Sequence, residues 1–516
     1  MKVMSAAEAA ALIADNTTLS FVGSGGAVLV PELVLEAVEE RFISTGHPAN
    51  ITLLHASGIG DKDKRGVNRF AHKGMVKRVI GGHWGWSPRM QKLALDGEIE
   101  AYNLPQGAMV SLFREIAAKR PGLITKTGLG TFVDPRIEGG ALNDRSPRNL
   151  IEVLQLGGEE WLWYKSFPLD VTIIRGTCAD SNGNISMEQE PVEFEVLAQA
   201  QAAHNSGGLV ICQVKYLTEN KTLDPMLVKV PGILVDVVVV DPEQKQTDEG
   251  VYNPAFRGQF PVPMGSMPVM ELTQRKIVTR RAAMELRKDA IVNLGFGMPD
   301  GVASVAAEEG FLDNITLSIE QGVFGGVPAQ GEIFGVAYNP EAIINAPSTF
   351  DFYSGNGLDM TFLGLAQADV EGNVNVSKFG SVIAGCGGFI DISQSAKKLV
   401  FCGTFTVGGL KTVIEDGKLR IAQEGRSRKF VSNVEQITYS GNFGRKFEQE
   451  VLYVTERAVF RLLPAGLTLV EIAPGIDLEK DILAMMDFVP KIADDLKIMD
   501  ERIFIDAPMG CFAEHS

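Results

Sequence analysis

A single carboxylate at the end of an apolar run is the first candidate for chemistry. In the stretch SIEQGVFGGVPAQ, residues 318–330, Glu320 follows Ile315, Leu317 and Ile319, whose alternation indicates a buried strand. An ionised carboxylate is costly to bury unless something uses it. The position of Glu320 therefore favours a functional role over a structural one.

Two glycine-rich segments are the next candidates, because glycines let backbone N–H groups approach a ligand. NLGFGMPDG, residues 293–301, follows a predicted strand and opens a predicted helix, where an anion or a developing negative charge is favoured. It fits a dinucleotide fingerprint poorly, because Asp300 would stand where the pyrophosphate should sit. The second cluster, at Gly385, Gly387 and Gly388, can supply donors for an oxyanion hole. Either segment also fits an ordinary turn.

Cysteine and histidine chemistry is less well supported. Cys386 lies within the second glycine cluster, but no histidine occurs between His204 and His515, so a Cys-His pair would need a distant partner. The six histidines show no HxH, HExxH or mixed Cys/His spacing, so no metal site is expected.

The chain resembles itself, and this repeat indicates how the candidates are positioned. NITLLHASG at residues 50–58 matches NITLSIEQG at residues 314–322. Further along the chain, the block that begins at Asp170 matches the block that begins at Asp359, and GLVICQV matches KLVFCGT. The three matches occur in the same order in both halves. Convergence of similar strands and turns is the alternative reading. In the repeat Glu320 aligns with Ala56, so the fold alone does not require a carboxylate there.

Short Val-, Ile- and Leu-rich runs alternate with helical patterns throughout the chain. This alternation predicts an α/β fold with two tandem related domains, each an open, mostly parallel sheet flanked by helices. The predicted domains are residues 1–240, with an insertion at about 59–169, and residues 271–516. Residues 241–270 are polar, Pro-rich and unperiodic, and they are the predicted linker.

Composition excludes several classes of protein. Forty-eight Lys and Arg against 64 Asp and Glu give a net charge of −16, which argues against a nucleic-acid binder or a protein that adheres to anionic membranes. The five cysteines are scattered and form no CxxC pair, which is consistent with a protein of the reducing cytoplasm. No signal peptide or membrane span is expected, because no run approaches eighteen apolar residues. Residues 61–86 hold seven Lys and Arg, either as a solvated face or as a contact for a phosphate-rich ligand.

These motifs together resemble the family I coenzyme A transferases, in particular the single-chain acetate and propionate CoA-transferases. The resemblance covers nearly the whole chain and includes YNLPQGAMVSLFREIAAKRPG, GFGMPDGVA, IEQGVFGGVP and IAGCGGFIDI. It implies that Glu320 is the covalent nucleophile, although many relatives have Asn or Ala where this chain has Gln321. It also implies that CoA and the reacting carbonyl contact Gly295, Phe296, Gly297, Met298, Pro299, Gly385, Gly387 and Gly388, with Asn373 as an oxyanion candidate.

The implied reaction is ping-pong transfer of CoA between a short-chain acyl-CoA and a carboxylate such as acetate, through a glutamyl-CoA thioester on Glu320. The glycines after Glu320 would leave room for the thioester. No cofactor is needed, because coenzyme A is a substrate, and the implied partners are acyl-CoA, short-chain carboxylates and further copies of the chain in a homo-oligomer, such as a tetramer. An acyl-CoA thioester hydrolase, a nicotinamide dehydrogenase and a non-catalytic binding protein stay open as alternatives.

Overall fold

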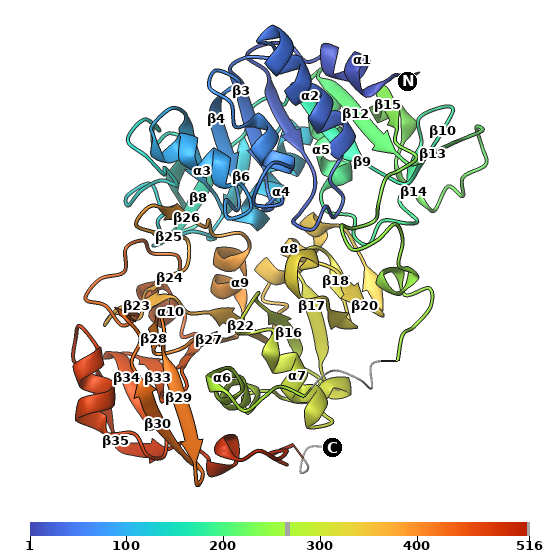
Figure 1. Ribbon diagram of the computed structural model, residues 1–516. Coiled ribbons are helices and arrows are strands. Elements are labelled where there is room, and N and C mark those ends of the chain that lie inside the picture. Colours follow the sequence, from blue (N-terminus) through green and yellow to red (C-terminus); the bar gives the residue numbers. More distant parts are fainter. Residues whose placement is uncertain (264–268, 513–516) are drawn as a thin grey trace. The chain divides into compact units, whose positions relative to one another are not determined.

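The computed structural model describes residues 1–263 and 269–512 (Figure 1). Internal contacts divide the chain into two compact units that are discontinuous in sequence. Unit 1 contains Met1–Val262, Ile319–Asp351 and Ser381–Asp391. Unit 2 contains Pro263–Ser318, Phe352–Gly380 and Ile392–Ser516.

Unit 1 is built on an eight-stranded sheet in which every neighbouring pair is parallel. Its central strands are buried on both faces, as expected of a parallel sheet covered by helices. In spatial order the strands are β1 (Lys2–Val3), β15 (Val237–Val240), β12 (Leu209–Val214), β9 (Val171–Arg175), β2 (Thr18–Phe21), β3 (Ile51–His55), β4 (Val76–Gly81) and β5 (Glu100–Asn103). The helices of this unit are α1 (Ala6–Ala11), α2 (Glu32–Thr45), α3 (Pro88–Leu95), α4 (Gln106–Ala117) and α5 (Val196–Asn205).

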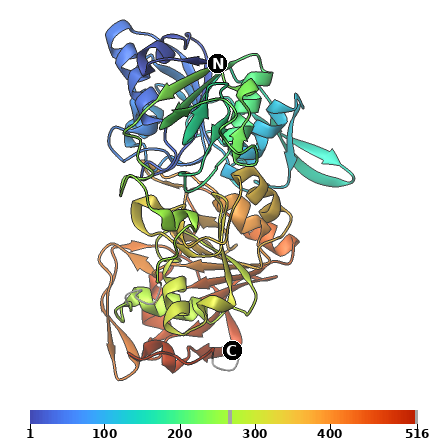
Figure 2. The ribbon, with the colours of Figure 1, turned by 90° about the vertical axis from the view of Figure 1, so that its right-hand side faces the viewer.

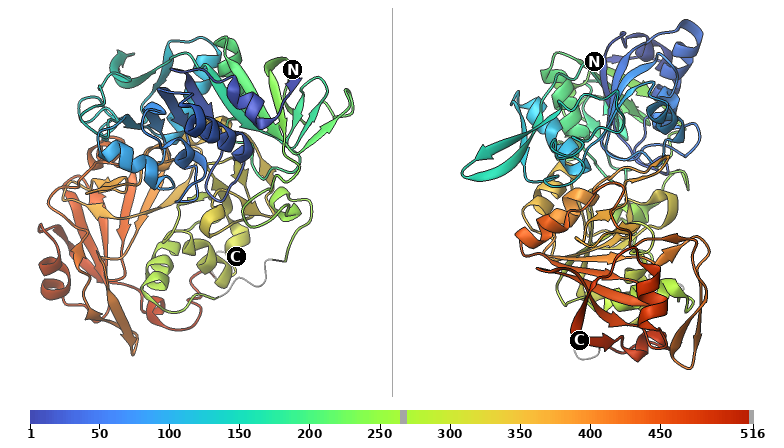
Figure 3. Two further views of the ribbon diagram at one scale, coloured as in Figure 1. Left: turned by 45° about the horizontal axis from the view of Figure 1, so that its top comes forward. Right: turned by 90° about the vertical axis from the view of Figure 1, so that its left-hand side faces the viewer.

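Unit 1 also contains smaller antiparallel elements outside this sheet. β6 (Gly122–Thr125), β8 (Glu159–Lys165) and β7 (Ile151–Leu156) form a three-stranded sheet. Its β7–β8 hairpin, coloured teal, extends away from unit 1 in Figure 2 and in the right-hand view of Figure 3. Further short pairs are β10 (Cys178–Asp180) with β11 (Ile185–Ser186), β18 (Val323–Phe324) with β21 (Ala342–Ile343), and β19 (Val327–Pro328) with β20 (Ala337–Tyr338).

Unit 2 has a mixed sheet with a parallel part and an antiparallel part. The parallel strands are, in order, β17 (Thr316–Ile319), β16 (Ile291–Leu294), β22 (Met360–Gly364), β27 (Lys398–Cys402) and β32 (Glu450–Val454). They are followed by β33 (Ala458–Leu463) and β34 (Gly466–Ile472), which are antiparallel, and by β35 (Lys491–Ile498), which is parallel to β34. The helices of this unit include α6 (Gln274–Ala283), α7 (Gly301–Glu308) and α10 (Gly441–Lys446).

The predicted repeat is matched by the topology of the two sheets. The order β12–β9–β2–β3 in the first sheet corresponds to β27–β22–β16–β17 in the second, and all these pairs are parallel. The aligned aspartates even make the same bond, because Asp170 accepts from the backbone N–H of Thr18 and Asp359 from that of Ile291. Ala56 follows β3 and Glu320 follows β17, so each follows the fourth strand of this shared order.

The predicted insertion adds strands β4 and β5 beyond β3, together with α3, α4 and the β7–β8 hairpin. The contact units do not follow the repeat, since residues 319–351 and 381–391 group with unit 1. The boundaries 1–240 and 271–516 stay a prediction. In the predicted linker, Phe256 is buried and Asp248 forms an ion pair with Arg65, while residues 264–268 lie outside the described residues.

Within the described residues, no helix has the length and apolar character needed to span a bilayer. The same residues contain no group of three or more His, Cys, Asp or Glu side chains suited to hold a metal ion.

Candidate active site

The chain leaves β17 at Ile319 and places Glu320 in a tight turn. Glu320 is only 8% exposed and Gln321 only 4%. The side-chain Nε2 of Gln321 donates a hydrogen bond of 3.2 Å to Oε1 of Glu320. Oε1 of Gln321 is buried and makes no hydrogen bond within the described chain. The turn therefore presents a buried carboxylate together with one polar atom that lacks a partner, as a site awaiting a ligand would.

Two of the glycines after Glu320 are needed where the chain approaches itself closely, a role that the sequence did not suggest. Gly322 has φ +110°, and a Cβ built on it would lie 1.9 Å from the carbonyl oxygen of Ile344. Gly326 has φ +72°, and its Cβ would lie 2.2 Å from the carbonyl oxygen of Tyr338. These glycines are required by close approach of the chain to itself, so they do not simply leave room for a thioester.

The second glycine cluster is held by one asparagine at the end of β5. Nδ2 of Asn103 donates to the carbonyl oxygens of Gly81, at 2.8 Å, and Gly82, at 2.6 Å, and its Oδ1 accepts from the backbone N–H of Cys386 at 2.9 Å. The N–H of Gly387 also donates to the carbonyl oxygen of Gly82 at 2.8 Å. Asn103 is fully buried. It therefore fixes the cluster against the carboxyl ends of β4 and β5.

Two amides of this cluster have no hydrogen-bond partner within the described residues. The backbone N–H groups of Cys386 and Gly387 are used by Asn103 and Gly82. The N–H groups of Gly385 and Gly388 make no hydrogen bond within the described part of the chain, although both residues are buried. Buried amides without a partner are rare in folded proteins. Gly385 and Gly388 are thus the candidate oxyanion donors of the predicted cluster.

His83 lies beside the cluster, although sequence analysis assigns no role to a histidine. A Cβ built on Gly387 would lie 3.6 Å from Cδ2 of His83, and Nδ1 of His83 accepts a 3.2 Å hydrogen bond from the N–H of Gly85. This bond places the ring proton on Nε2. Burial, helped by nearby His55, lowers the pKa of His83 to about 4. The imidazole is therefore neutral at physiological pH and presents an N–H donor. In the sequence, His83 stands in the glycine-rich motif GGHWG, which could have indicated that it is a site residue.

Asp391 connects the cluster to the start of α4. Its Oδ2 accepts a hydrogen bond of 3.0 Å from the backbone N–H of Gly107, and a Cβ on Gly107 would lie 2.4 Å from the ring of Phe350. Burial, with a smaller contribution from the charge of Glu320, raises the pKa of Asp391 to about 7. Burial also raises the pKa of the Cys386 thiol well above its usual value, so this cysteine stays protonated and is a poor nucleophile.

Replacing Asp391 with Asn should flatten the pH dependence of stability between about pH 4 and pH 7. The raised pKa means that folded Asp391 keeps a proton which the unfolded chain, with its ordinary pKa of 3.8, has lost. Its contribution is fully present below pH 3.8 and is lost as the pH rises through about 7. Urea unfolding across this range should show wild type losing stability relative to the variant. Parallel curves for the two proteins would contradict the assignment.

The other predicted site residues lie in unit 2. In the loop Gly295 to Pro299, the N–H of Gly295 donates to the carbonyl oxygen of Phe362 at 2.8 Å. Gly297 has φ +92°, which favours glycine, and Phe296 is 57% exposed. Asp300 is paired with Arg275. Contact between CoA and the loop from Gly295 to Pro299 stays a prediction.

Asn373 is engaged in a turn within unit 2. Its Nδ2 donates to Asp369 at 3.0 Å, and its Oδ1 accepts from the N–H of Gly441 at 3.0 Å. The repeat counterpart Asn184 makes the equivalent bonds to Asp180 and Gly232. This match supports a structural role, while the oxyanion role stays an untested prediction.

Similar proteins were identified over nearly the whole chain. The family model for Coenzyme A transferase matches residues 3–241. Caffeate CoA-transferase of Acetobacterium woodii is 50% identical over 98% of this chain and 97% of its own length. Acetate CoA-transferase YdiF of Escherichia coli (strain K12) is 46% identical over 98% of this chain and 96% of its own length.

A solved structure of a relative shows that the similarity extends to the fold. The acyl-CoA transferase YdiF from E. coli O157:H7, in a thioester complex with CoA, has a TM-score of 0.93 and 45% identity, covering 98% of this chain and 97% of the other. The predicted α/β fold, with large parallel and mixed sheets flanked by helices, is confirmed by this similarity.

Proposed function

Because the chain belongs to the family I coenzyme A transferases and transfers CoA between acyl-CoA and carboxylates, we propose that Glu320 is its covalent nucleophile in a ping-pong reaction. The observation that carries this proposal is a buried carboxylate where the repeat has Ala56. The preferred donors are short-chain acyl-CoAs, and the acceptor is a small carboxylate such as acetate.

The proposed first half-reaction has two steps. The carboxylate of Glu320 attacks the thioester carbonyl, the C–S bond breaks, and a mixed anhydride and CoA thiolate form. The thiolate then attacks the glutamyl carbonyl, which releases the donor's acid as a carboxylate and leaves a glutamyl-CoA thioester. A second carboxylate runs these steps in reverse and leaves as the new acyl-CoA, so the thioester energy is conserved.

The surroundings of Glu320 suit each requirement of this chemistry. Its low exposure limits access of water, which would hydrolyse the anhydride or the thioester. The hydrogen bond from Gln321 to Oε1 orients the carboxylate. The N–H of Gly388 is the proposed donor to the tetrahedral oxyanion, and one such donor is worth about 3 kcal/mol in the transition state. Binding of the remote parts of CoA would supply the remaining energy needed to form the anhydride.

A matrix of donors and acceptors tests the proposal. Acetyl-, propionyl-, butyryl-, acetoacetyl- and caffeoyl-CoA would each be paired with acetate, propionate and caffeate, because the relatives' names point to acetate and to caffeate. We expect parallel double-reciprocal lines and the highest kcat/KM with short-chain pairs. One methylene changes the rate by about 10- to 200-fold at most. Intersecting lines contradict the ping-pong mechanism, and acid release that needs no acceptor carboxylate would identify a hydrolase.

Assembly and location also stay predictions. A homo-oligomer in the cytoplasm is expected. Light scattering, which gives the molar mass in solution, tests whether the protein is an oligomer.

A further inference from the structure

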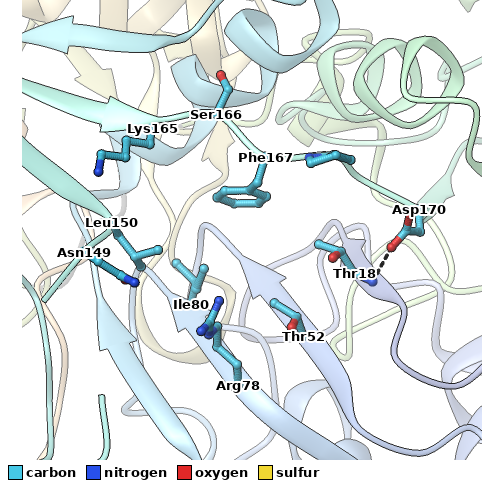
Figure 4. A pocket seen from close by; sticks show the side chains of 11 residues that line it. Thr18, Thr52, Arg78, Ile80, Asn149, Leu150, Lys165, Ser166, Phe167 and Asp170 are labelled. Carbon is cyan, nitrogen blue, oxygen red and sulfur yellow. Dashed lines mark hydrogen bonds between the residues drawn. The ribbon is translucent and has the colours of Figure 1, made fainter. Parts of the chain in front are cut away.

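A cavity of about 360 Å³ in unit 1 lies apart from the candidate active site (Figure 4). It is formed where β2, β3 and β9 begin, under the segment that follows β8. In open parallel sheets ligands usually bind at the carboxyl ends of the strands, which here carry Gly81 and Asn103. The residues that line the cavity are Thr18, Thr52, Arg78, Ile80, Asn149, Leu150, Lys165, Ser166, Phe167, Pro168 and Asp170.

Strand register gathers the polar side of this cavity into one row. Thr52 is paired with Thr18 on β2 and with Arg78 on β4. Arg78 is in turn paired with Glu100 on β5. Paired residues on neighbouring strands direct their side chains to the same face of a sheet. The two hydroxyls and the guanidinium therefore line one wall.

Arg78 has an unused binding edge. Its Nε donates to Glu100 at 2.5 Å, and its two terminal NH₂ groups make no hydrogen bond within the described residues. The hydroxyls of Thr18 and Thr52 also have no hydrogen-bond partner there, and Thr52 is only 8% exposed. A guanidinium with two free donors can bind a carboxylate in a bidentate manner. This wall thus offers donors suited to a small anion.

The acidic side chains nearby are already engaged. Glu100 accepts from Arg78, Asp170 accepts from the N–H of Thr18 at 2.8 Å, and Glu152 is paired with Lys165. Each of these carboxylates has a donor of its own, so the unused donors of Arg78 are left for a ligand.

Apolar side chains complete part of the lining, beside Asn149, Lys165 and Ser166. Figure 4 shows the ring of Phe167 above the guanidinium of Arg78, with Ile80 and Leu150 between them at the side. An aromatic face and two aliphatic side chains suit a flat, apolar body of modest size. The volume lies within the range of sites that bind small organic molecules.

The geometry points to a second ligand site, in which Arg78 holds the carboxylate of a small aromatic acid and Phe167, Ile80 and Leu150 contact its ring. This site is separate from Glu320 and takes no part in the chemistry of CoA transfer.

Titration calorimetry with benzoate tests the site in the full-length protein. Arg78→Gln should weaken benzoate binding about tenfold or more, since a charged hydrogen-bonded pair is lost. Phe167→Leu, which keeps the charge, should weaken it severalfold. Arg89→Gln is the matched control, because Arg89 is exposed, is paired with Asp63 and does not line the cavity. Benzyl alcohol and inorganic phosphate should bind at least tenfold more weakly than benzoate.

Rates of transfer from acetyl-CoA to propionate separate this site from the catalytic one. Arg78→Gln and Phe167→Leu should leave that rate within about twofold of wild type, whatever the outcome for Glu320. Equal benzoate affinity in wild type and both cavity variants would overturn the inference. The same conclusion follows if wild type binds no benzoate at millimolar concentration, or binds phosphate as tightly. If Arg78→Gln does not fold, Phe167→Leu against Arg89→Gln decides the question.

Discussion

Glu320→Gln should reduce CoA transfer by at least about 10⁴-fold while leaving the fold intact. Gln has nearly the same shape as Glu but cannot form the anhydride or the thioester. The side chain is buried, and replacing an ionised carboxylate by a neutral amide removes a charge that is costly to bury. We therefore expect no loss of thermal stability. Initial rates with acetyl-CoA and propionate measure the effect.

The covalent intermediate provides a second measurement on the same variant. After exposure to acetyl-CoA, intact-mass spectra of wild type should show an added CoA, and borohydride should reduce the thioester and inactivate the enzyme. Glu320→Gln should show neither change. Glu332→Gln is the matched control, because Glu332 lies in the same segment but its side chain is 63% exposed. Full activity in Glu320→Gln would refute the assignment of the nucleophile.

Two alanine substitutions in the second glycine cluster should have very different effects. Gly385 has φ +82°, and its Cβ would lie 2.8 Å from the backbone N of Trp84 and 2.9 Å from Cα of His83. Backbone atoms cannot move aside cheaply, so Gly385→Ala must displace the cluster. We expect kcat to fall by about 100-fold or more, as when an oxyanion donor is lost, and stability to fall by about 2 kcal/mol.

Gly387→Ala is the matched control for this displacement. Gly387 has φ +52°, within the small left-handed region that other residues can enter, and the nearest atom to its Cβ is 3.6 Å away on the side chain of His83. The expected cost is about 1 kcal/mol, with kcat within a few-fold of wild type. Thermal unfolding and initial rates measure both variants. Comparable losses in the two would show that the exact placement of the cluster does not matter.

The sequence could predict the strands because their signal is local. Runs such as TLSI at β17 and VVVV at β15 have the apolar character of buried strands, and the structure places them in parallel sheets. The two sheets could be related because the repeated blocks keep their order. The same comparison singled out Glu320, since Ala56 occupies the equivalent position after β3.

The hydrogen bonds that hold the second glycine cluster in place could not be predicted from local sequence patterns. Asn103 and Cys386 are 283 residues apart, and Gly107 and Asp391 are 284 apart. A polar residue at a strand end is compatible with many partners, and only the packed chain selects one. The glycines at 322 and 326 illustrate the same limit, because their need for glycine comes from carbonyl oxygens on a later segment.

The sequence by itself determined the α/β fold, the repeat and the identity of the candidate nucleophile, because periodicity and internal asymmetry are properties of the chain order. Only the tertiary structure decided which residues support the site and where a second ligand could bind. Asn103, Asp391 and the row that contains Arg78 arise from register between strands and from long-range hydrogen bonds. These depend on which surfaces the folded chain buries together, and that information is not local to any segment.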